Sequence, residues 1–511
     1  MEFPNNPYEE LNLYSNFSQA AKKYPKVAIH FDGTLIGFPE LGLETTYEEA
    51  EKRIIVQASR LSLMGIQKGD KVVIYKSPMF DTYLLAVAVS YLGAVPIMIS
   101  YHLPVPTMTI MCQRLEEPWL IYDHETAAKA PAITSIKRDH LVELEQLREL
   151  PVNGTVPQSF LPLSEISYMT HTSGTTGVPK LIAHSAQSMG WRTKWQRNVF
   201  DLMPEKKLVA FHISPVHSRF NIGISSLMSK GFPLLWIGNG QIEAVSKTLS
   251  QFEPYALETH PNNFVQWSRL AKEKPELFAS FNYFHSTFDA INKGTMKIFL
   301  EASQADKPVF MQVYGQSECG PMIMRFHTKE SIVELNARNM GIGMPELTEV
   351  RIVDQKGREL PAKESGNIQM LSKGRALTYY QEDLRFTENT YGLWWDSGDF
   401  GYKDDAGDLY LLDRQVDLIN KVDSTLLIED VLLDQLEFLD EVVIVRGKNN
   451  VAQPIISVDA DSEMDWERWW QAIADFPLLN EPLIWAFEDI PRTATMKVQR
   501  LKIEEGLKAD S

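Results

Sequence analysis

Residues 170–185 read THTSGTTGVPKLIAHS, and the interpretation of the whole chain starts from this stretch. Small hydroxyl residues and glycines follow one another, and a Pro-Lys pair ends the run. Glycines let backbone N–H groups approach an anion, hydroxyls donate without adding charge, and a lysine neutralises anionic oxygens. The stretch therefore predicts a phosphate-binding loop that consists of Thr172, Ser173, Gly174, Thr175, Thr176, Gly177 and Lys180.

The order of residues in this loop differs from that of nucleotide hydrolases. Their loop reads G-x-x-x-x-G-K-[ST], which this stretch does not match, so a simple nucleotide hydrolase is disfavoured. The remaining alternative is a surface turn rich in serine, threonine and glycine. The apolar residues from Ile166 to Met169, directly before the run, and the closing Pro179-Lys180 favour the phosphate loop.

Size and composition limit the classes of protein that fit. A chain of 511 residues exceeds what one hydrophobic core organises, so we expect at least two domains. The 67 acidic and 50 basic residues give a net charge of −17, which repels nucleic acid, and we expect no nucleic-acid partner. Cys112 and Cys319 form no C-x-x-C pair, so the sequence predicts neither a disulfide framework nor a structural zinc site.

One apolar stretch, Tyr83 to Ile99, approaches the length that spans a membrane. Gly93 and Pro96 divide it, which favours a buried helix through Leu92 followed by a short strand from Val95. We therefore expect no membrane span. The first residues, MEFPNNPYEE, show no basic region followed by an apolar run, so no secretory signal is predicted and the cytoplasm is the expected compartment.

The pattern of apolar residues predicts an α/β fold. Short apolar strands alternate with helical patterns in the first two thirds of the chain, as in parallel sheets. Predicted strands lie at 27–29, 71–74, 95–99, 208–211, 233–237 and 308–314. After Gly341 short strands and turns predict a small antiparallel or barrel-like subdomain, and a last unit of roughly a hundred residues begins near Gln415.

Four further motifs follow the loop in a set order. They read VYGQSECG at 313–320, GIGMP at 341–345, WWDSGDFGYKDDAGDLYLLDR at 394–414 and PRTATMKVQRLK at 491–502. Together with the loop, this order resembles the adenylate-forming superfamily of acyl-CoA synthetases, peptide-synthetase adenylation domains and luciferases. The resemblance extends over nearly the whole chain.

The resemblance implies a domain organisation. Residues 1–413 would form a large N-terminal domain of two stacked βα sheets, with a β-barrel-like subdomain at about 345–413. Residues 414–511 would form a small, mobile α+β C-terminal domain that carries Lys497.

The resemblance also implies a reaction. A carboxylic acid would attack the α-phosphate of ATP in the presence of Mg²⁺, expel pyrophosphate and become an acyl-AMP. That step depends on charge neutralisation more than on acid–base chemistry. A thiol, either of CoA or of the phosphopantetheine on an acyl carrier protein, would then take the acyl group.

Individual residues match the motifs of the superfamily. The loop would hold the β- and γ-phosphates, and Glu318, after Ser317, would be the magnesium-associated carboxylate. Tyr314, followed by Gly315, would pack against adenine. The nucleotide-binding residues implied by the resemblance also include Asp399 and Arg414, both at the ribose.

Two more residues have a catalytic interpretation beside a structural one. Lys497 matches the lysine that bridges the carboxylate and the α-phosphate, although on its own it could be a solvated lysine of a basic tail. Its frame of Pro491-Arg492 and Gln499-Arg500 favours the catalytic role. His217 matches the histidine at the entrance of the acyl pocket, and packing in the core is an equally open interpretation.

The chain departs from the superfamily pattern at residues implied in the second half-reaction, the transfer of the acyl group to the thiol. Val416 stands where the hinge residue is Asp or Lys, and Asp423 stands where a glycine lets pantetheine pass. A carboxylate at that position repels polyanionic CoA and favours a carrier protein or another specialised acceptor. Phe288 and Asp289 would narrow the acyl channel and disfavour long fatty acids; alternatively, Asp289 would contact a polar group of the substrate. An alternative function is an adenylate-binding homologue that has lost or altered thioester formation and acts in binding or regulation.

Two other patterns have plain structural interpretations. Asp404, Asp405 and Asp408 could hold a metal, but Asp-Asp-Ala-Gly-Asp between two strands predicts a hairpin turn. Trp466, Trp469, Trp470 and Ile473 have the spacing of one helix face, which predicts a buried stripe with Ser462 or Asp461 as the helix cap.

Overall fold

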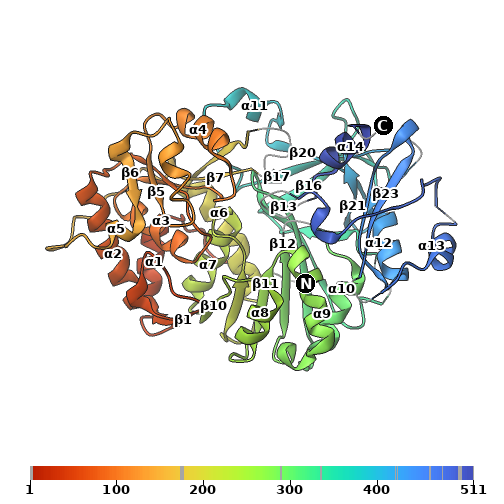
Figure 1. The fold of residues 1–511 in the computed structure, drawn as a ribbon, viewed down its shortest axis with the longest axis horizontal. Helices are drawn as coiled ribbons and strands as arrows, with labels where there is room; N and C mark the ends of the chain where they lie inside the picture. Colours follow the sequence, from red (N-terminus) through yellow and green to blue (C-terminus); the bar gives the residue numbers. More distant parts are fainter. Residues whose placement is uncertain are drawn as a thin grey trace. The chain divides into compact units, whose positions relative to one another are not determined.

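The computed structural model describes residues 4–172, 178–287, 290–333, 336–419, 422, 424–459, 462–474, 476–492 and 498–509. Contacts within the chain group it into two compact units, each built from segments that are distant in sequence (Figure 1). The first unit comprises Met1–Thr259, Gly315–Pro321 and Ser372–Asn389, and the second comprises His260–Tyr314, Met322–Leu371 and Thr390–Ser511.

The first unit contains a seven-stranded sheet that includes the predicted phosphate-loop region. Its strand order is β18 (Thr378–Tyr379), β8 (Leu181–Ser185), β7 (Ile166–His171), β4 (Val95–Met98), β3 (Lys71–Ile74), β5 (Trp119–Tyr122) and β6 (Leu141–Glu143). The strands from β7 to β6 are parallel, whereas β8 is antiparallel to both β7 and β18. The loop therefore joins two antiparallel strands, and one edge of the sheet comes from residues nearly two hundred positions later.

A second set of strands in the first unit has the order β2 (Glu44–Thr46), β1 (Ala28–Phe31), β10 (Leu234–Trp236), β9 (Val209–His212) and β11 (Ala256–Thr259). These strands are parallel except for β2. Two groups of helices accompany the sheets. The longer ones are α1 (Leu13–Lys23), α2 (Tyr47–Met64), α3 (Asp81–Tyr91), α4 (Val105–Arg114), α6 (Ala186–Phe200), α7 (Ser218–Lys230) and α8 (Ile242–Leu249), and the short ones are α5 (Leu144–Leu147) and α11 (Asp383–Thr387).

The long apolar stretch forms a buried helix and a buried strand, as predicted. Every residue of α3 is buried, because α3 packs against both α1 and α2. A helix that is apolar on all sides belongs in such an interior position. The residues of β4 are buried as well, as in parallel strands covered on both faces. Among the described residues, none of the helices combines the length and apolar character that a membrane crossing requires.

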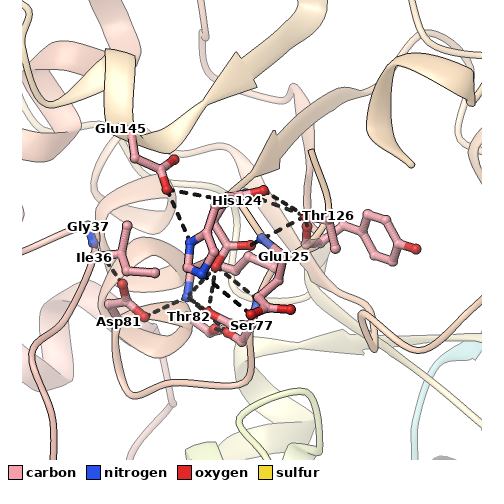
Figure 2. Close-up of polar contacts among 12 residues, drawn as sticks. Ile36, Gly37, Ser77, Asp81, Thr82, His124, Glu125, Thr126 and Glu145 are labelled. Atoms are coloured by element: carbon pink, nitrogen blue, oxygen red, sulfur yellow. Dashed lines mark hydrogen bonds and ion pairs between the residues drawn. The ribbon is translucent and has the colours of Figure 1, made fainter. Parts of the chain in front are cut away.

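A fully buried group of charged side chains, Lys76, Asp81 and Asp123, lies at the carboxyl ends of β3 and β5. Figure 2 labels Asp81 of this group, with Gly37 and Ser77 near it. The Lys76 ammonium donates to Asp81 Oδ1 at 2.7 Å and lies 3.8 Å from Asp123 Oδ2. Asp81 Oδ2 accepts the N–H of Gly37 at 2.8 Å, and Asp123 Oδ2 accepts the N–H of Ser77 at 3.1 Å. The carboxylates therefore fasten two loops to the ends of the strands, and the lysine offsets their charge.

The second unit contains a run of strands in the order β16 (Thr348–Val353), β17 (Gly366–Ser372), β20 (Trp394–Lys403), β21 (Leu409–Arg414), β15 (Asn339–Gly343), β14 (Gly320–His327), β13 (Val309–Gln316) and β12 (Tyr283–Thr287). The short β19 (Thr390–Tyr391) pairs with β20. The antiparallel strands expected after Gly341 are present, but they extend an open sheet instead of closing a barrel. Helices α9 (Pro261–Glu273) and α10 (Lys293–Ala302) pack together in this unit.

The acidic segment at 404–408 forms the predicted hairpin turn between β20 and β21. Asp404 Oδ1 accepts the backbone N–H groups of Ala406 and Asp408, both at 2.9 Å, and Gly407 has φ +88°. A carboxylate that caps its own turn is a structural element. Within the described residues, no group of three or more metal-ligating side chains of His, Cys, Asp or Glu is found.

The C-terminal part of the second unit is α+β. A three-stranded sheet has the order β22 (Leu439–Arg446), β23 (Ala452–Val458) and β24 (Leu483–Ile484). The accompanying helices are α12 (Thr425–Gln435), α13 (Trp466–Ala472) and α14 (Arg500–Ala509). Leu432, Ile456 and Trp469 belong to one buried cluster between these elements.

The prediction for the tryptophan stripe is wrong in two respects. Trp469 is buried, but Trp466 and Trp470 are 41% and 47% exposed. The helix cap is Asp465, whose carboxylate accepts the N–H of Arg468 at 3.0 Å, and not Ser462; Asp461 lies outside the described residues. Because α13 spans only two turns and packs on one side, the helical spacing extends beyond the face that the core covers.

Candidate nucleotide-binding site

The ends of the predicted phosphate loop are fixed to each other. The N–H of Thr172 donates to the carbonyl of Lys180 at 3.0 Å, and the N–H of Lys180 donates to the Thr172 hydroxyl at 3.0 Å. These bonds continue the pairing of β7 with β8 by one residue on each strand. Ser173, Gly174, Thr175, Thr176 and Gly177, which complete the predicted loop, lie outside the described residues.

A buried histidine supports the first end of the loop. Nε2 of His171 accepts the N–H of Ser100 at 3.1 Å, so the ring proton is on Nδ1, which donates to the carbonyl of Thr172 at 2.7 Å. Burial lowers the pKa of His171, and the neutral ring satisfies both bonds. The loop therefore begins from a rigid, hydrogen-bonded position.

Lys180 and Glu318 meet at the hydroxyl of one tyrosine. The Lys180 ammonium donates to the Tyr379 hydroxyl at 3.2 Å, and that hydroxyl donates to Oε1 of Glu318 at 2.7 Å. Burial lowers the pKa of Lys180, while the Glu318 carboxylate opposes this shift. Burial and the Glu318 carboxylate both raise the pKa of Tyr379. The first unit thus brings the Lys180 ammonium and the Glu318 carboxylate to one place. The resemblance implies that the first contacts ATP and the second contacts its metal.

The backbone around Glu318 is held by a buried arginine on α6. Arg192 donates to the carbonyl oxygens of Ser317 at 2.9 Å, Glu318 at 2.9 Å and Gly374 at 2.7 Å. Burial lowers the pKa of Arg192 to about 10. Since one planar guanidinium satisfies three carbonyl groups, it fixes the position from which the Glu318 side chain projects.

The segment 315–320 needs glycine at both ends. A Cβ on Gly315 would lie 2.2 Å from the carbonyl oxygen of Gly320. Gly320 has φ +83°, which favours glycine, and its added Cβ would meet the Arg192 side chain at 2.9 Å. The turn that carries Ser317 and Glu318 is therefore closed too tightly for any larger residue at these two positions.

His217 is buried at the N-terminus of α7, where it forms the helix cap position. The next residue, Ser218, accepts a long hydrogen bond of 3.4 Å from Arg192. His217 therefore lies one residue from a side chain that contacts the arginine behind Glu318. Its two interpretations, a pocket residue and a packed histidine, stay predictions.

The second unit brings the three residues implied at adenosine close together. The Tyr314 hydroxyl donates to Oδ2 of Asp399 at 2.6 Å. Asp399 and Arg414 are directly opposite each other on the antiparallel strands β20 and β21, which puts their side chains on one face of the sheet. The side chain of Gln415 donates to Asp396 at 3.0 Å and to the backbone carbonyl of Asp399 at 3.3 Å. A carboxylate and an arginine on one face of the sheet, with a tyrosine hydroxyl bonded to the carboxylate, suit the diol of a ribose and its base.

Several predicted residues lie outside the described part of the chain. They are Lys497, Asp423, Phe288 and Asp289. The residues that flank the Lys497 segment are described: Arg492 and Val498 form an isolated antiparallel bridge, and the N–H of Gln499 donates to the carbonyl of Pro491 at 2.8 Å. Val416, which stands at the position of the hinge residue, is described and is 60% exposed.

Glu318 is suited to share a magnesium ion with phosphate oxygens. Among the described residues, only one of its two carboxylate oxygens accepts a hydrogen bond. Mg²⁺ is commonly held by one or two carboxylates together with substrate phosphates, rather than by a cage of protein ligands. The single buried carboxylate and the neighbouring lysine fit that arrangement.

Sequence reasoning did not find two residues of this site. Arg192 is an arginine within a helix, and Tyr379 lies in a two-residue strand without any motif. Arg192 contacts Glu318, 126 residues away, and Tyr379 contacts Lys180, 199 residues away, so no local pattern could have indicated either residue.

Comparison with known proteins gives consistent results. Residues 17–380 match the family model described as AMP-binding enzyme. The chain is 33% identical to 3-amino-2-hydroxy-4-methoxybenzoate diazotase of Streptomyces cremeus, over 96% of this chain and 95% of that protein. It is 24% identical to a 4-chlorobenzoate–CoA ligase of an Arthrobacter species, over 92% of each chain. The fold matches the anthranilate CoA ligase AuaEII in complex with anthranoyl-AMP, with a TM-score of 0.82, 18% identity and full coverage of both chains.

Proposed function

The chain belongs to the AMP-binding enzyme family, and on this basis we propose that it is an ATP-dependent, AMP-forming ligase that activates a small carboxylic acid and passes the acyl group to a thiol. The family match agrees with the adenylate-forming superfamily that the ordered motifs indicated. The observation that carries the proposal is the buried meeting of Lys180 and Glu318 at Tyr379, beside the ends of a phosphate loop.

The first half-reaction forms a mixed anhydride. A carboxylate oxygen attacks the α-phosphorus of ATP, the bond to the β-phosphate oxygen breaks, and pyrophosphate leaves. Lys180 and the loop hold the β- and γ-phosphates, and the Glu318 carboxylate holds Mg²⁺, which would neutralise the leaving pyrophosphate. Asp399 and Arg414 bind the ribose, with Tyr314 at the base.

Lys497 supplies the remaining charge in this proposal. Its ammonium would lie between the carboxylate and the α-phosphate, in a C-terminal domain of residues 414–511 that moves between the two half-reactions. In the second half-reaction a thiolate attacks the acyl carbon and AMP leaves. The acceptor is CoA or a carrier-protein phosphopantetheine, and the carboxylate of Asp423 favours the carrier protein because it repels the phosphates of CoA.

Acid-dependent exchange of labelled pyrophosphate into ATP tests the first half-reaction. We expect exchange with at least one member of a broad panel of carboxylic acids, and its loss in Lys497→Ala. No exchange with any acid would contradict the proposal, and unchanged AMP release in Lys497→Ala would contradict the role of the lysine. The first outcome would favour an adenylate-binding homologue that acts in binding or regulation.

The acceptor is tested separately. Thioester formation is measured with CoA and with a pantetheinylated carrier protein, for the wild type and for Asp423→Gly. We expect Asp423→Gly to gain activity with CoA but not with the carrier protein. A variant that is no better with CoA would contradict the role given to Asp423.

A second candidate function is favoured by the Streptomyces cremeus relative, whose name describes a diazotase. A diazo group needs a second nitrogen at the oxidation level of nitrite, and nitrite is a planar oxyanion of the size of a carboxylate group. In this reaction a nitrite oxygen would attack the α-phosphorus and pyrophosphate would leave. The amino nitrogen of an aromatic amine would then attack the nitrogen of the mixed anhydride and release AMP, and the resulting N-nitroso compound would lose water to give the diazo group. The altered thiol loop is compatible with an acceptor that is not a thiol.

One assay separates the two candidates. The enzyme is incubated with ATP and Mg²⁺, and with either a carboxylic acid plus a thiol or nitrite plus an aminobenzoate. Pyrophosphate release that needs the acid supports the ligase. Release that needs nitrite, together with a diazo product that couples to a phenol and gives a coloured azo compound, supports the diazotase.

A further inference from the structure

Tyr379 is placed between the two charged side chains of the phosphate site by a strand that comes from a distant part of the chain. On β18 it pairs with Ile182 of β8, the strand that directly follows Lys180. The N–H of Tyr380 donates to the carbonyl of Leu181 at 2.8 Å and fixes the register. The position of the tyrosine is therefore set by the sheet that also carries the loop.

The environment of Tyr379 leaves its hydroxyl little freedom. The residue is 1% exposed, and its ring packs edge-on against Phe386 with the centroids 5.1 Å apart. The Lys180 ammonium lies 4.4 Å from the centroid of the tyrosine ring, so it is held by the ring as well as by the hydroxyl. A buried tyrosine with a fixed ring offers one hydroxyl position to its two partners.

A phenol has a particular effect between a lysine and a glutamate. The ammonium can only donate and the carboxylate can only accept, so without a spacer the two would form a direct ion pair. In a poorly hydrated position such a pair attracts strongly, and ATP and Mg²⁺ would have to break it in order to bind. The hydroxyl accepts from one group and donates to the other, so each keeps a partner while they stay apart.

We propose that Tyr379 is a positioning residue that keeps Lys180 and Glu318 separated and oriented for the phosphates and the metal of Mg·ATP. The inference rests on the proposed function, since it assigns these two side chains to the same ligand. On binding, the ammonium turns to a phosphate oxygen and the carboxylate takes the metal, while the phenol keeps its hydrogen bond to Glu318. The chain thereby avoids an internal ion pair that would compete with the nucleotide.

Binding measurements on Tyr379→Phe test the inference without any acid substrate. Phenylalanine keeps the ring, its contact with Phe386 and the cation–π contact, and removes only the hydroxyl. We expect the Kd of Mg·ATP, measured by titration calorimetry, to rise roughly 10-fold, since hydrogen bonds to charged groups are worth about that factor. The Mg²⁺ concentration needed for half-maximal ATP binding should rise as well.

Two controls distinguish positioning from general damage. The Kd of AMP should not change, because AMP carries neither the β- nor the γ-phosphate. Tyr380→Phe removes a hydroxyl one residue away and should bind Mg·ATP like the wild type. The inference is overturned if Tyr379→Phe binds Mg·ATP as tightly as the wild type, or if it weakens AMP by the same factor. A wild type that binds neither ATP nor AMP would remove the proposed function itself, and the inference with it.

Discussion

At the scale of single residues, the protein contains ionic groups that are completely buried, and each is satisfied by named partners. Lys76 offsets the charge of Asp81 and Asp123, and the two carboxylates also accept backbone N–H groups. Removing one partner of such a group is costly, because the charges that remain cannot be solvated. Mutation of the buried lysine should therefore be far more harmful than mutation of an exposed one.

We predict that Lys76→Met lowers the free energy of unfolding by about 3–5 kcal/mol, since two buried carboxylates lose their cation. Lys52, which is 60% exposed beside Glu48, provides the control, and Lys52→Met should change stability by less than about 0.5 kcal/mol. Denaturant unfolding followed by tryptophan fluorescence measures both variants. Equal stability of the two variants would contradict the energetic role given to Lys76.

The sequence predicted some residues of the site and missed others. The ordered motifs indicated Lys180, Glu318 and Asp399, because each lies in a local pattern of distinctive residues. Tyr379 and Arg192 were missed, since their importance lies only in what they touch.

At the scale of elements, strands with continuous apolar runs were predicted well. β3 has the predicted bounds, Lys71–Ile74; β4 ends one residue earlier than predicted, and β9 begins and ends one residue later than predicted. Such runs are bounded by glycine or polar residues, which fixes their ends. The two-residue strand β18 could not be predicted, because its pairing with β8 depends on a tertiary contact and not on its own residues.

The cap of α13 gives a prediction at this scale. Asp465 accepts the N–H of Arg468, whereas Ser462, one of the caps expected from the sequence, is exposed and does not cap the helix. We predict that Asp465→Ala destabilises the C-terminal part by about 1 kcal/mol, the usual cost of a lost N-cap. Ser462→Ala should have an effect below about 0.5 kcal/mol. Thermal unfolding of the two variants compares them, and a larger loss in Ser462→Ala would contradict the assignment.

At the scale of the whole molecule, buried histidines contribute to how stability depends on pH. Burial lowers the pKa of His171, His184 and His212, and that of His327 to about 4. In an unfolded chain a histidine has a pKa of about 6.5. Below that pH these histidines bind protons in the unfolded state but not in the folded state, so their contribution to stability is complete above about pH 6.5 and decreases as the pH falls toward 4.

We predict that the midpoint temperature of thermal unfolding decreases when the pH is lowered from 7 to 5. In His327→Gln this decrease should be smaller. His327 is fully buried, and Nε2 contacts Gln312 Oε1 at 2.9 Å. The comparison is the slope of the midpoint against pH in the two proteins, not the midpoint itself. A variant with the same slope as the wild type would show that His327 does not titrate between the two states.

The contribution of β18 to the first sheet also has a consequence for biosynthesis. As the nascent chain leaves the ribosome, β7 and β8 emerge early, but the strand that covers the edge of β8 emerges only with residue 379. At about 5–20 residues per second, translation of residues 186–377 takes on the order of 10–40 s. Through that interval the N-terminal sheet has an unprotected edge, which makes the half-made protein a client for chaperones that bind exposed strands.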